Sequence, residues 1–159
     1  MTNRLHHAAL IVEDLETSLR FWRDGIGLDV LMDQSFDGDW TGLFHARADH
    51  LHSVFLGDAA IPTAGIVELV VFEEGSDKGP PVPTAPAKGF FLLSFYVDLS
   101  ATAERLATLG YPLRTSIEVT AGDATPGGPV EVGEGQTATL QMATVVSPDG
   151  VLVELIGLG

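Results

Sequence analysis

The sequence predicts an α+β chain made of two repeats, each with a strand, a helix and then several strands. The string Val-Glu-Leu occurs twice inside apolar, strand-like runs, at residues 66–72 and 152–156. Its glutamates, Glu68 and Glu154, are 86 positions apart (154 − 68). Such a matching pair indicates an internal repeat.

Each repeat opens with a strand that runs into a helix. Residues 7–15 form an apolar run that ends in acidic residues, and residues 92–99 repeat it 85 positions later (92 − 7). Amphipathic stretches at residues 15–24 and 101–109 follow these strands and end near glycines, as is typical of helix C-termini. Period-two alternation and short apolar runs predict the strands of the first repeat at residues 5–12, 28–34, 51–56 and 66–72.

A segment rich in proline and glycine separates the two repeats. Residues 75–88 can hold neither a helix nor a central strand. We therefore predict a first module at residues 1–74, a linker at 75–88 and a second module at 89–159, which together make one domain. A further Gly- and Pro-rich stretch, residues 120–129, is long for a loop of a compact domain and predicts a lid.

Composition and charge restrict the partners of the chain. A hydrophobic content of 45% in 159 residues supports a substantial core. The 22 acidic and 8 basic side chains give a formal net charge of −14, and this field repels nucleic acids and anionic lipid surfaces. We expect no nucleic-acid or membrane partner, and a small-molecule ligand that is neutral, apolar or cationic.

The chain has no cysteine, which excludes a disulfide framework, a thiolate metal site and a thiol nucleophile. Its first residues lack the apolar core of a signal peptide, and no apolar run is long enough to cross a bilayer. We expect a cytoplasmic protein.

The two repeated glutamates lie inside strands whose other residues are apolar. A carboxylate that is buried in a strand is costly unless a partner neutralises it, so two at matching positions suggest a shared cation such as a metal ion. The alternative is that both face solvent from half-exposed strands. It is disfavoured because the residues two positions away, which share the face of each glutamate, are apolar.

Both ends of the chain carry motifs of a known family. The opening run at residues 7–15, the string Leu-Arg-Phe-Trp-Arg-Asp-Gly-Ile-Gly-Leu at 19–28 and the closing Ser-Pro-Asp-Gly-Val-Leu-Val-Glu-Leu-Ile at 147–156 resemble the vicinal oxygen chelate superfamily. That family includes glyoxalase I, methylmalonyl-CoA epimerase, extradiol dioxygenases, fosfomycin-modifying enzymes and bleomycin-binding proteins. The resemblance implies two tandem βαβββ modules that form a curled mixed sheet around one cleft. It is specific for fold and unspecific for reaction.

The resemblance also implies four metal-ligand positions, in the first and last strand of each module. His7, Glu68 and Glu154 fall on three of them. The fourth falls on Leu92, where enzymes of the family usually place histidine, and no histidine follows His52 in the chain.

One imidazole and two carboxylates, with water in the remaining positions, suit a divalent Mn, Fe, Ni, Co or Zn ion. They are not the two histidines and one carboxylate of an extradiol dioxygenase. Two alternatives stay open: the chain binds no metal, or His7 is a strand histidine that bonds to backbone.

A general base would come from another strand. His50 and His52 share one strand face, and His52 lies about where epimerase-like members carry their proton-abstracting carboxylate. A neutral imidazole is suited to proton transfer near neutral pH. We therefore predict His52 and Glu154 as catalytic residues, with a solvent-bonded His52 at the strand entry as the equal alternative.

Aromatic residues suggest where a substrate pocket lies. Phe91 and Phe95 crowd the strand that holds Leu92, and we predict all three as pocket residues. Trp40 stands in an acidic loop, from which we expect it to close over a bound ligand. Trp22 instead has helical spacing from its apolar neighbours, which is typical of a core anchor.

Two functions remain. The first is a metal-assisted isomerase, epimerase or lyase of the glyoxalase type that moves a proton next to a carbonyl of a neutral or apolar substrate. The second is a metal-free, drug-sequestering protein that resembles the bleomycin-resistance members and whose acidic surface attracts cationic aromatic compounds. The sequence favours the enzyme, because a pure binding cleft has little reason to keep two buried glutamates facing a histidine. By resemblance we also expect a homodimer.

Overall fold

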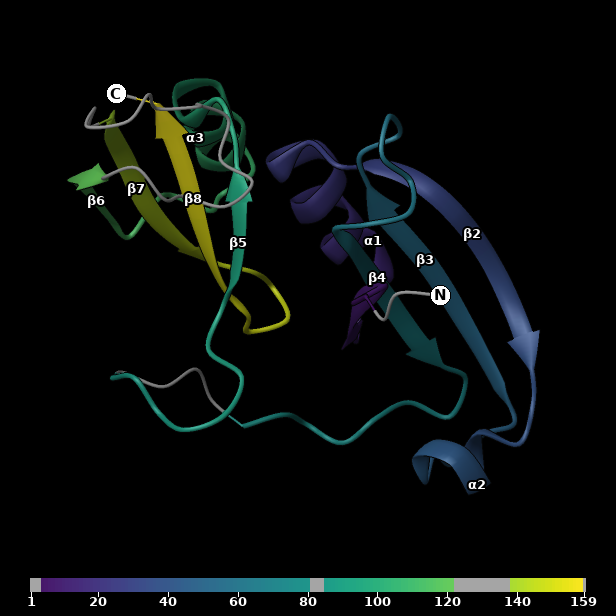
Figure 1. Ribbon diagram of the computed structural model, residues 1–159. Helices are drawn as coiled ribbons and strands as arrows, with labels where there is room; N and C mark the ends of the chain where they lie inside the picture. The colour runs from purple at the N-terminus through teal and green to yellow at the C-terminus, as the bar shows by residue number, and fades with distance from the viewer. Residues whose placement is uncertain (1–3, 81–84, 122–137, 159) are drawn as a thin grey trace. The chain divides into compact units, whose positions relative to one another are not determined.

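The chain consists of two compact units, each with its own sheet and helices (Figure 1). The computed structural model describes residues 4–80, 85–121 and 138–158. The units are Met1–Pro80 and Pro81–Gly159, so the division falls within the predicted proline-rich linker. Most of the predicted lid at 120–129 lies outside the described residues.

The first unit contains one helical segment, one short helix and four strands. Their order along the chain is β1 (His7–Ile11), α1 (Leu15–Leu19) with its π-helical continuation η1 (Arg20–Ile26), β2 (Asp29–Asp37), α2 (Trp40–Phe44), β3 (His50–Gly57) and β4 (Ile66–Phe72). The strands form a sheet of order β1-β4-β3-β2, in which β1 and β4 are parallel and the other pairs antiparallel.

The second unit repeats this topology. Its elements are β5 (Leu93–Tyr96), α3 (Leu99–Thr108), β6 (Thr115–Ala121), β7 (Ala138–Val146) and β8 (Leu152–Leu158). The sheet order is β5-β8-β7-β6, again with one parallel pair at the start. The predicted α+β fold of two tandem βαβββ modules is therefore confirmed, although the described strands form two four-stranded sheets where we expected one curled sheet.

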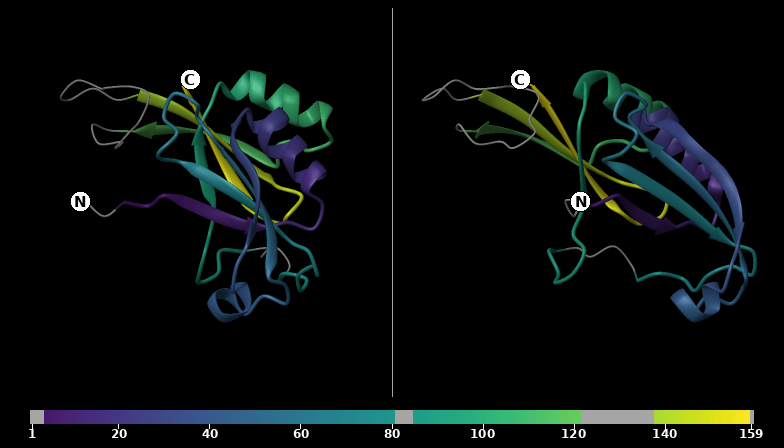
Figure 2. Two further views of the ribbon diagram at one scale, coloured as in Figure 1. Left: turned by 90° about the vertical axis from the view of Figure 1, so that its right-hand side faces the viewer. Right: turned by 45° about the vertical axis from the view of Figure 1, so that its right-hand side comes forward.

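Both long helical segments begin at the aspartate that ends the preceding apolar run. The carboxylate of Asp14 accepts a hydrogen bond from the Thr17 backbone N–H at 3.1 Å, and Asp98 accepts one from Ala101 at 3.0 Å. These are N-caps, which satisfy backbone donors that have no partner inside the helix. Capping also lowers the pKa of Asp14, chiefly through the Thr17 hydroxyl. Within each unit, a helix lies against one face of the sheet (Figure 2).

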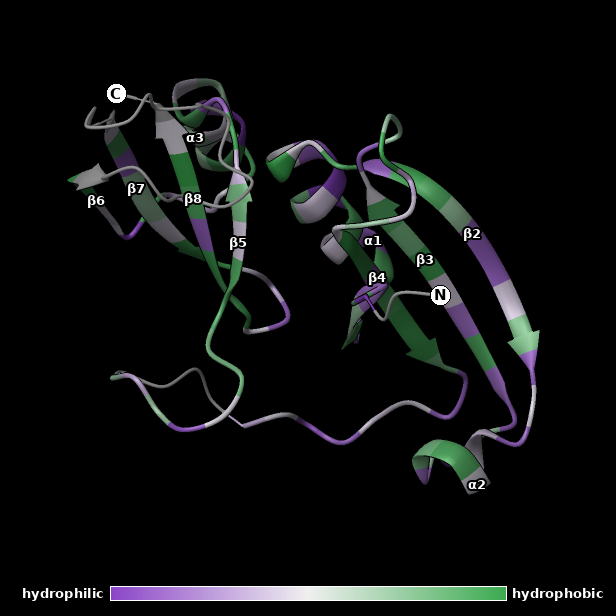
Figure 3. Ribbon diagram, viewed as in Figure 1, coloured by the Kyte–Doolittle hydropathy of each residue, from purple (hydrophilic) through white to green (hydrophobic). Residues whose placement is uncertain are grey.

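The core of the first unit lies between η1 and the sheet. Phe21 and Trp22 are fully buried and meet edge to face, with ring centroids 5.0 Å apart. Trp22 is thus confirmed as a core anchor. Figure 3 shows β4 as hydrophobic over most of its length, while β2 carries hydrophilic segments, as expected for a central and an edge strand.

Strand alternation gives this sheet two different faces. Val54 on β3 and Leu69 on β4 are paired in register and fully buried. Phe55 and Glu68, the next pair along, therefore point to the other face. One face supplies the core, and the other is free to form a site.

Polar pairs link the edge strand β2 to its neighbour β3. His50 Nδ1 lies 2.7 Å from Asp37 Oδ1, and His52 Nε2 lies 2.8 Å from Asp33 Oδ1. The Ser35 hydroxyl is 2.9 Å from the other ring nitrogen of His52. These cross-strand contacts tie the edge strand β2 to β3.

In the described part of the chain, no helix combines the length and the apolar character that crossing a membrane requires.

Replacing Gly157 by alanine is expected to destabilise the second unit. A Cβ there would lie 2.8 Å from the Leu99 Cβ at the start of α3 and 3.5 Å from the Val97 carbonyl oxygen, so β8 and α3 must separate. We expect a loss of about 1 to 3 kcal/mol in the free energy of unfolding, measured by urea titration. Gly79→Ala, which has open space around the new Cβ, is the control, and equal stability of the two variants would contradict this packing.

The His50–Asp37 pair predicts a pH dependence of stability. The hydrogen bond to Asp37 is the main cause that raises the pKa of His50 above its ordinary value of 6.5. The pair therefore stabilises the fold below pH 6.5, and that contribution is lost as the pH rises through the folded-state pKa. In Asp37→Asn, NMR titration should give a lower His50 pKa and unfolding should lose this pH dependence, whereas Asp33→Asn should leave the His50 pKa unchanged.

Candidate functional site

The carboxylate of Glu68 is the centre of the candidate site. It lies in the middle of β4, and its side chain is 14% exposed. Its Oε2 is 3.0 Å from His7 Nε2 on β1, and its Oε1 accepts a hydrogen bond of 2.6 Å from the Ser53 hydroxyl on β3. Each neighbouring strand thus supplies one partner, as a half-buried carboxylate requires.

His7 is held from three sides. Its Nδ1 lies 2.8 Å from His6 Nδ1, and its ring centroid is 5.3 Å from that of Phe55. Strand alternation would put His6 on the opposite side from His7, but its ring also approaches Phe55, at 5.9 Å, because His6 precedes the first residue of β1. A His7 that donates from Nε2 to Glu68 must accept at Nδ1 from His6. A His7 that offers a lone pair from Nε2 must donate at Nδ1, so the His6 contact suits either tautomer.

The donor atoms of this pair fit a metal ion. Two ligand atoms that are each about 2.1 Å from one ion, at right angles, lie about 3.0 Å apart. The His7 and Glu68 donors are separated by 3.0 Å, and the second hydrogen bond of each side chain holds its orientation, as is usual around metal ligands. Among residues 4–80, 85–121 and 138–158, however, no three His, Asp or Glu side chains gather into one metal centre.

The pair lines a cavity of about 680 Å³ that is bounded by residues of the first unit. Its walls are mainly apolar and include Ile11, Met32, Leu51 and Val70. Five aromatic residues complete the apolar lining, and they are Phe36, Trp40, Phe44, Phe55 and Phe72. A volume of this size suits an ordinary small-molecule ligand.

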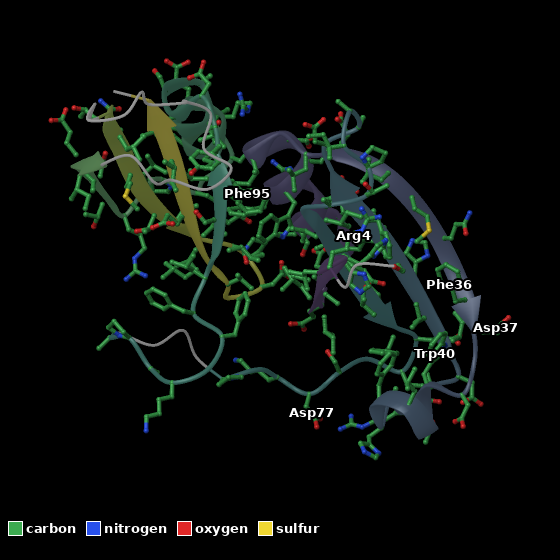
Figure 4. The ribbon with its side chains drawn as sticks, viewed as in Figure 1. Arg4, Phe36, Asp37, Trp40, Asp77 and Phe95 are labelled. Carbon is green, nitrogen blue, oxygen red and sulfur yellow. The ribbon has the colours of Figure 1, made fainter. Side chains whose placement is uncertain are left out.

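The short helix α2 forms one end of this cavity, where we predicted a loop. Asp39 caps it by accepting a 2.7 Å hydrogen bond from the Gly42 backbone N–H, so this acidic residue next to Trp40 has a structural role. Figure 4 shows Phe36 on β2 and Trp40 on α2 at the same end of the sheet. Trp40 lines the cavity, in agreement with the site predicted for it, while its closing over a ligand stays a prediction.

A charged pair, Arg47 and Asp77, also lines the cavity. The guanidinium of Arg47 donates to the Asp77 carboxylate. Asp77 belongs to the segment after β4 (Figure 4), so this ion pair fastens the start of the linker to the loop after α2. Both side chains are more than half exposed.

In the second unit, Glu154 occupies the position that matches Glu68. It lies on β8 and is neither fully buried nor fully exposed. Its Oε2 accepts a 2.7 Å hydrogen bond from the Ser94 hydroxyl on β5. The partner serine thus comes from the parallel neighbouring strand, whereas Ser53 comes from the antiparallel one.

The strand registers identify the counterpart of His7. Glu68 pairs with Ala9 across the parallel ladder, two residues after His7. Glu154 pairs with Ser94, two residues after Leu92. The register therefore places Leu92 where His7 stands in the first unit, as the sequence offset predicts.

His52 does not join the cavity. It shares its face of β3 with Val54 and Leu56, which are fully buried on the core side, and Glu68 points to the opposite face. The structure thus places His52, the predicted base, on the opposite face of the sheet from Glu68, a predicted metal ligand. Strand parity is the reason, because Ser53 and Phe55, not His52, share the face of Glu68.

The two predicted aromatic pocket residues of the second unit, Phe91 and Phe95, also lie elsewhere than predicted. Phe95 on β5 pairs with the fully buried Leu155, whereas Ser94 pairs with Glu154, so Phe95 faces the opposite side of the sheet from Glu154. Phe91 precedes β5 and is 53% exposed. Among the contributors to the site that were not predicted are Ser53, Phe55, Arg47 and Asp77. Ser53 and Phe55 could have been found from their parity with Glu68, whereas the other two belong to irregular segments without a sequence signal.

Comparison with known proteins agrees with the fold and with the resemblance. A lactoylglutathione lyase-like protein, terB, from Aspergillus terreus is 33% identical over 157 residues, which cover 96% of this chain and 74% of that protein. A glyoxalase family protein from Bacillus cereus matches with a TM-score of 0.71 at 18% identity, covering 100% of this chain and 97% of the other.

A more distant structure carries a metal. A variant of the fosfomycin resistance protein FosX from Listeria monocytogenes, solved with Mn(II) and dihydroxypropylphosphonic acid, matches with a TM-score of 0.56 at 16% identity. The match covers 98% of this chain and 92% of that one. The model of the Glyoxalase/Bleomycin resistance protein/Dioxygenase superfamily matches residues 4–155. The chain therefore belongs to this superfamily.

Proposed function

We propose that the chain is a metal-assisted isomerase, epimerase or lyase of the glyoxalase type, which moves a proton next to a carbonyl group of a neutral or apolar substrate. The observation that carries this proposal is the His7–Glu68 pair, which lies 3.0 Å apart on the wall of an otherwise apolar cavity. Polar groups that converge at one place in an apolar pocket are typical of a catalytic site.

We assign His7, Glu68 and Glu154 as the metal ligands. A bound divalent Mn, Fe, Ni, Co or Zn ion supplies Lewis-acid chemistry, which stabilises negative charge on a carbonyl oxygen. The lactoylglutathione lyase-like relative and the Mn(II) in the FosX structure support a metal-dependent activity of this general kind.

The residues of the chain have two further tasks. Ser53 is fully buried and holds one oxygen of Glu68 through its 2.6 Å hydrogen bond, so the other oxygen keeps a fixed direction toward His7. The apolar walls, including Phe55 and Val70, exclude water from the region where a proton is moved. Exclusion of water strengthens the electrostatic effect of the remaining polar groups.

We assign the proton transfer to Glu154. In the described part of the chain its carboxylate has the neutral Ser94 hydroxyl as its hydrogen-bond partner, on one of the two oxygens. When Glu154 is not bound to the metal, its second oxygen can take a proton from a carbon and return it. His52 is left out of this proposal because its ring lies on the other face of its sheet from Glu68.

Glu154→Gln is expected to lower both metal binding and turnover. Plasma mass spectrometry of untagged protein, purified without chelator, should find near-stoichiometric divalent metal in the wild type and more than about a tenfold loss of metal affinity in the variant. Deuterium uptake next to the carbonyl in a panel of neutral ketones, followed by NMR, reports the proton transfer. Both readouts should fall together, because the amide neither binds a metal well nor accepts a proton.

Glu118→Gln is the matched control. Glu118 lies on β6 of the same sheet and is exposed. Its register partner is Gln141, whereas Glu154 pairs with Thr144 three residues further along β7, so Glu118 is on the face away from Glu154. The control variant makes the same change of charge without touching the site. The proposal fails if Glu154→Gln matches Glu118→Gln in metal content and in deuterium uptake.

A second function is favoured by one observation. Leu92 occupies the register position of His7, so the second unit lacks the imidazole that the first unit has. The chain would then be a metal-free, drug-sequestering protein, in which the acidic surface attracts cationic aromatic compounds to the apolar cavity.

Calorimetric titration distinguishes this second function. If it is correct, basic aromatic drugs should bind to metal-free protein, and their affinity should fall as the salt concentration rises, because a net charge of −14 attracts cations less when it is screened. Absence of binding across a representative drug panel would count decisively against sequestration.

A further inference from the structure

The cavity of the first unit has an aromatic end that no described residue of that unit covers. None of the five residues of α2 is buried, although Trp40, Leu43 and Phe44 are large and apolar. The Trp40 and Phe44 rings are stacked at 5.8 Å with an interplanar angle of 5°. Exposed apolar surface of this kind is costly unless a ligand or partner removes it from water.

Trp40 offers its ring face and not its polar edge. The indole N–H donates to the Phe36 carbonyl at 3.3 Å, so it is already used within the chain. Phe36 and Phe72 both pair in register with Leu51 and therefore share its face of the sheet. The result is a wall of aromatic carbon at the α2 end of the cavity.

The distance along β4 between the aromatic end and the polar end of the cavity follows from the strand spacing. Glu68 and Phe72 are four residues apart on the same face, which corresponds to about 13 Å at about 3.3 Å per residue. Phe55 is the register partner of Glu68 and continues the aromatic lining up to the His7–Glu68 pair. A ligand that contacts both ends needs a flat body of about two fused rings and one polar group at its end.

The charges of the lining disfavour anionic ligands. Arg47 is the one Lys or Arg among the lining residues, and it is already bonded to Asp77. Glu68 adds a second carboxylate. A ligand with free carboxylates, such as a glutathione conjugate, would have to displace Asp77 from Arg47 against the net negative charge of the chain.

We propose that the first unit selects an uncharged, planar aromatic ketone or aldehyde, whose rings lie against Phe36, Trp40 and Phe72 and whose carbonyl reaches the His7–Glu68 pair. The reaction in this inference rests on the proposed function. The substrate class rests on the aromatic residues and the charges that line the cavity. It separates this chain from an enzyme that acts on glutathione conjugates.

The test is isothermal titration calorimetry of the full chain with probes of defined charge. They are 2-acetylnaphthalene, its carboxylate analogue 2-naphthoate, its ammonium analogue 2-naphthylmethylamine, and S-benzylglutathione. The uncharged ketone should bind at least tenfold more tightly than each of the other three. Tighter binding of any charged probe would overturn the proposal.

Variants of α2 locate the binding. Trp40→Ala should weaken binding of 2-acetylnaphthalene roughly tenfold, because ring stacking and buried apolar area are both lost. Leu43→Ala is the matched control, since Leu43 lies on the same helix but not in the cavity lining, and it should bind as the wild type does. Equal effects of the two substitutions would refute the aromatic wall as the ligand site, and circular dichroism checks that both variants fold.

The proposed substrate class and the proposed metal-dependent activity can fail independently, and the experiments distinguish the two failures. Trp40-dependent binding of the ketone to a protein that takes up no metal and exchanges no deuterium would keep the substrate class and refute the enzyme. Stoichiometric metal together with a preference for S-benzylglutathione would keep the enzyme and refute the substrate class.

Discussion

The half-buried carboxylate of Glu68 is the constraint around which the first unit is organised. A carboxylate in the middle of a central strand is costly to bury unless hydrogen-bonding or charged partners compensate for the lost water. β1 brings His7 and β3 brings Ser53, and each does so only in the observed register. A shift of either strand by one residue would turn its partner to the other face. The arrangement that stabilises the sheet is therefore the same arrangement that builds the candidate site.

The carboxylates of Glu68 and Glu154 have different partners in the two units. Glu68 has an imidazole and a hydroxyl as partners, whereas Glu154 has one hydroxyl, and that hydroxyl is on the opposite neighbouring strand. The register position of Ser94 in the second unit is held by Ala9 in the first. The repeat has thus kept the carboxylates and the strand order while the groups around them have diverged.

Sequence reasoning reached the features that depend on local pattern. The repeated Val-Glu-Leu string located β4 and β8, the aspartates that end the apolar runs are helix caps, and the offset of 85 residues identified Leu92 as the counterpart of His7. It failed where the outcome depends on a strand face or on irregular backbone. The resemblance to epimerase-like members suggested His52 as the base near Glu68, but strand parity puts Ser53 and Phe55 on the face of Glu68 instead. The helix α2 has five residues and an aspartate cap inside a segment of turn-forming composition, so neither periodicity nor length could reveal it.

The edge strand β2 carries an aspartate at every fourth position, at Asp29, Asp33 and Asp37. Asp33 and Asp37 bind histidines of β3, and Asp29 accepts a hydrogen bond from the Ala59 backbone at 3.1 Å. An edge strand exposes unpaired backbone groups to which a strand of another molecule can add, and charged side chains along the edge oppose this. Two copies that approached through β2 would bring six carboxylates together. The aspartates that fasten β2 to its own sheet therefore also line its edge with negative charge, which disfavours the addition of a strand from another copy.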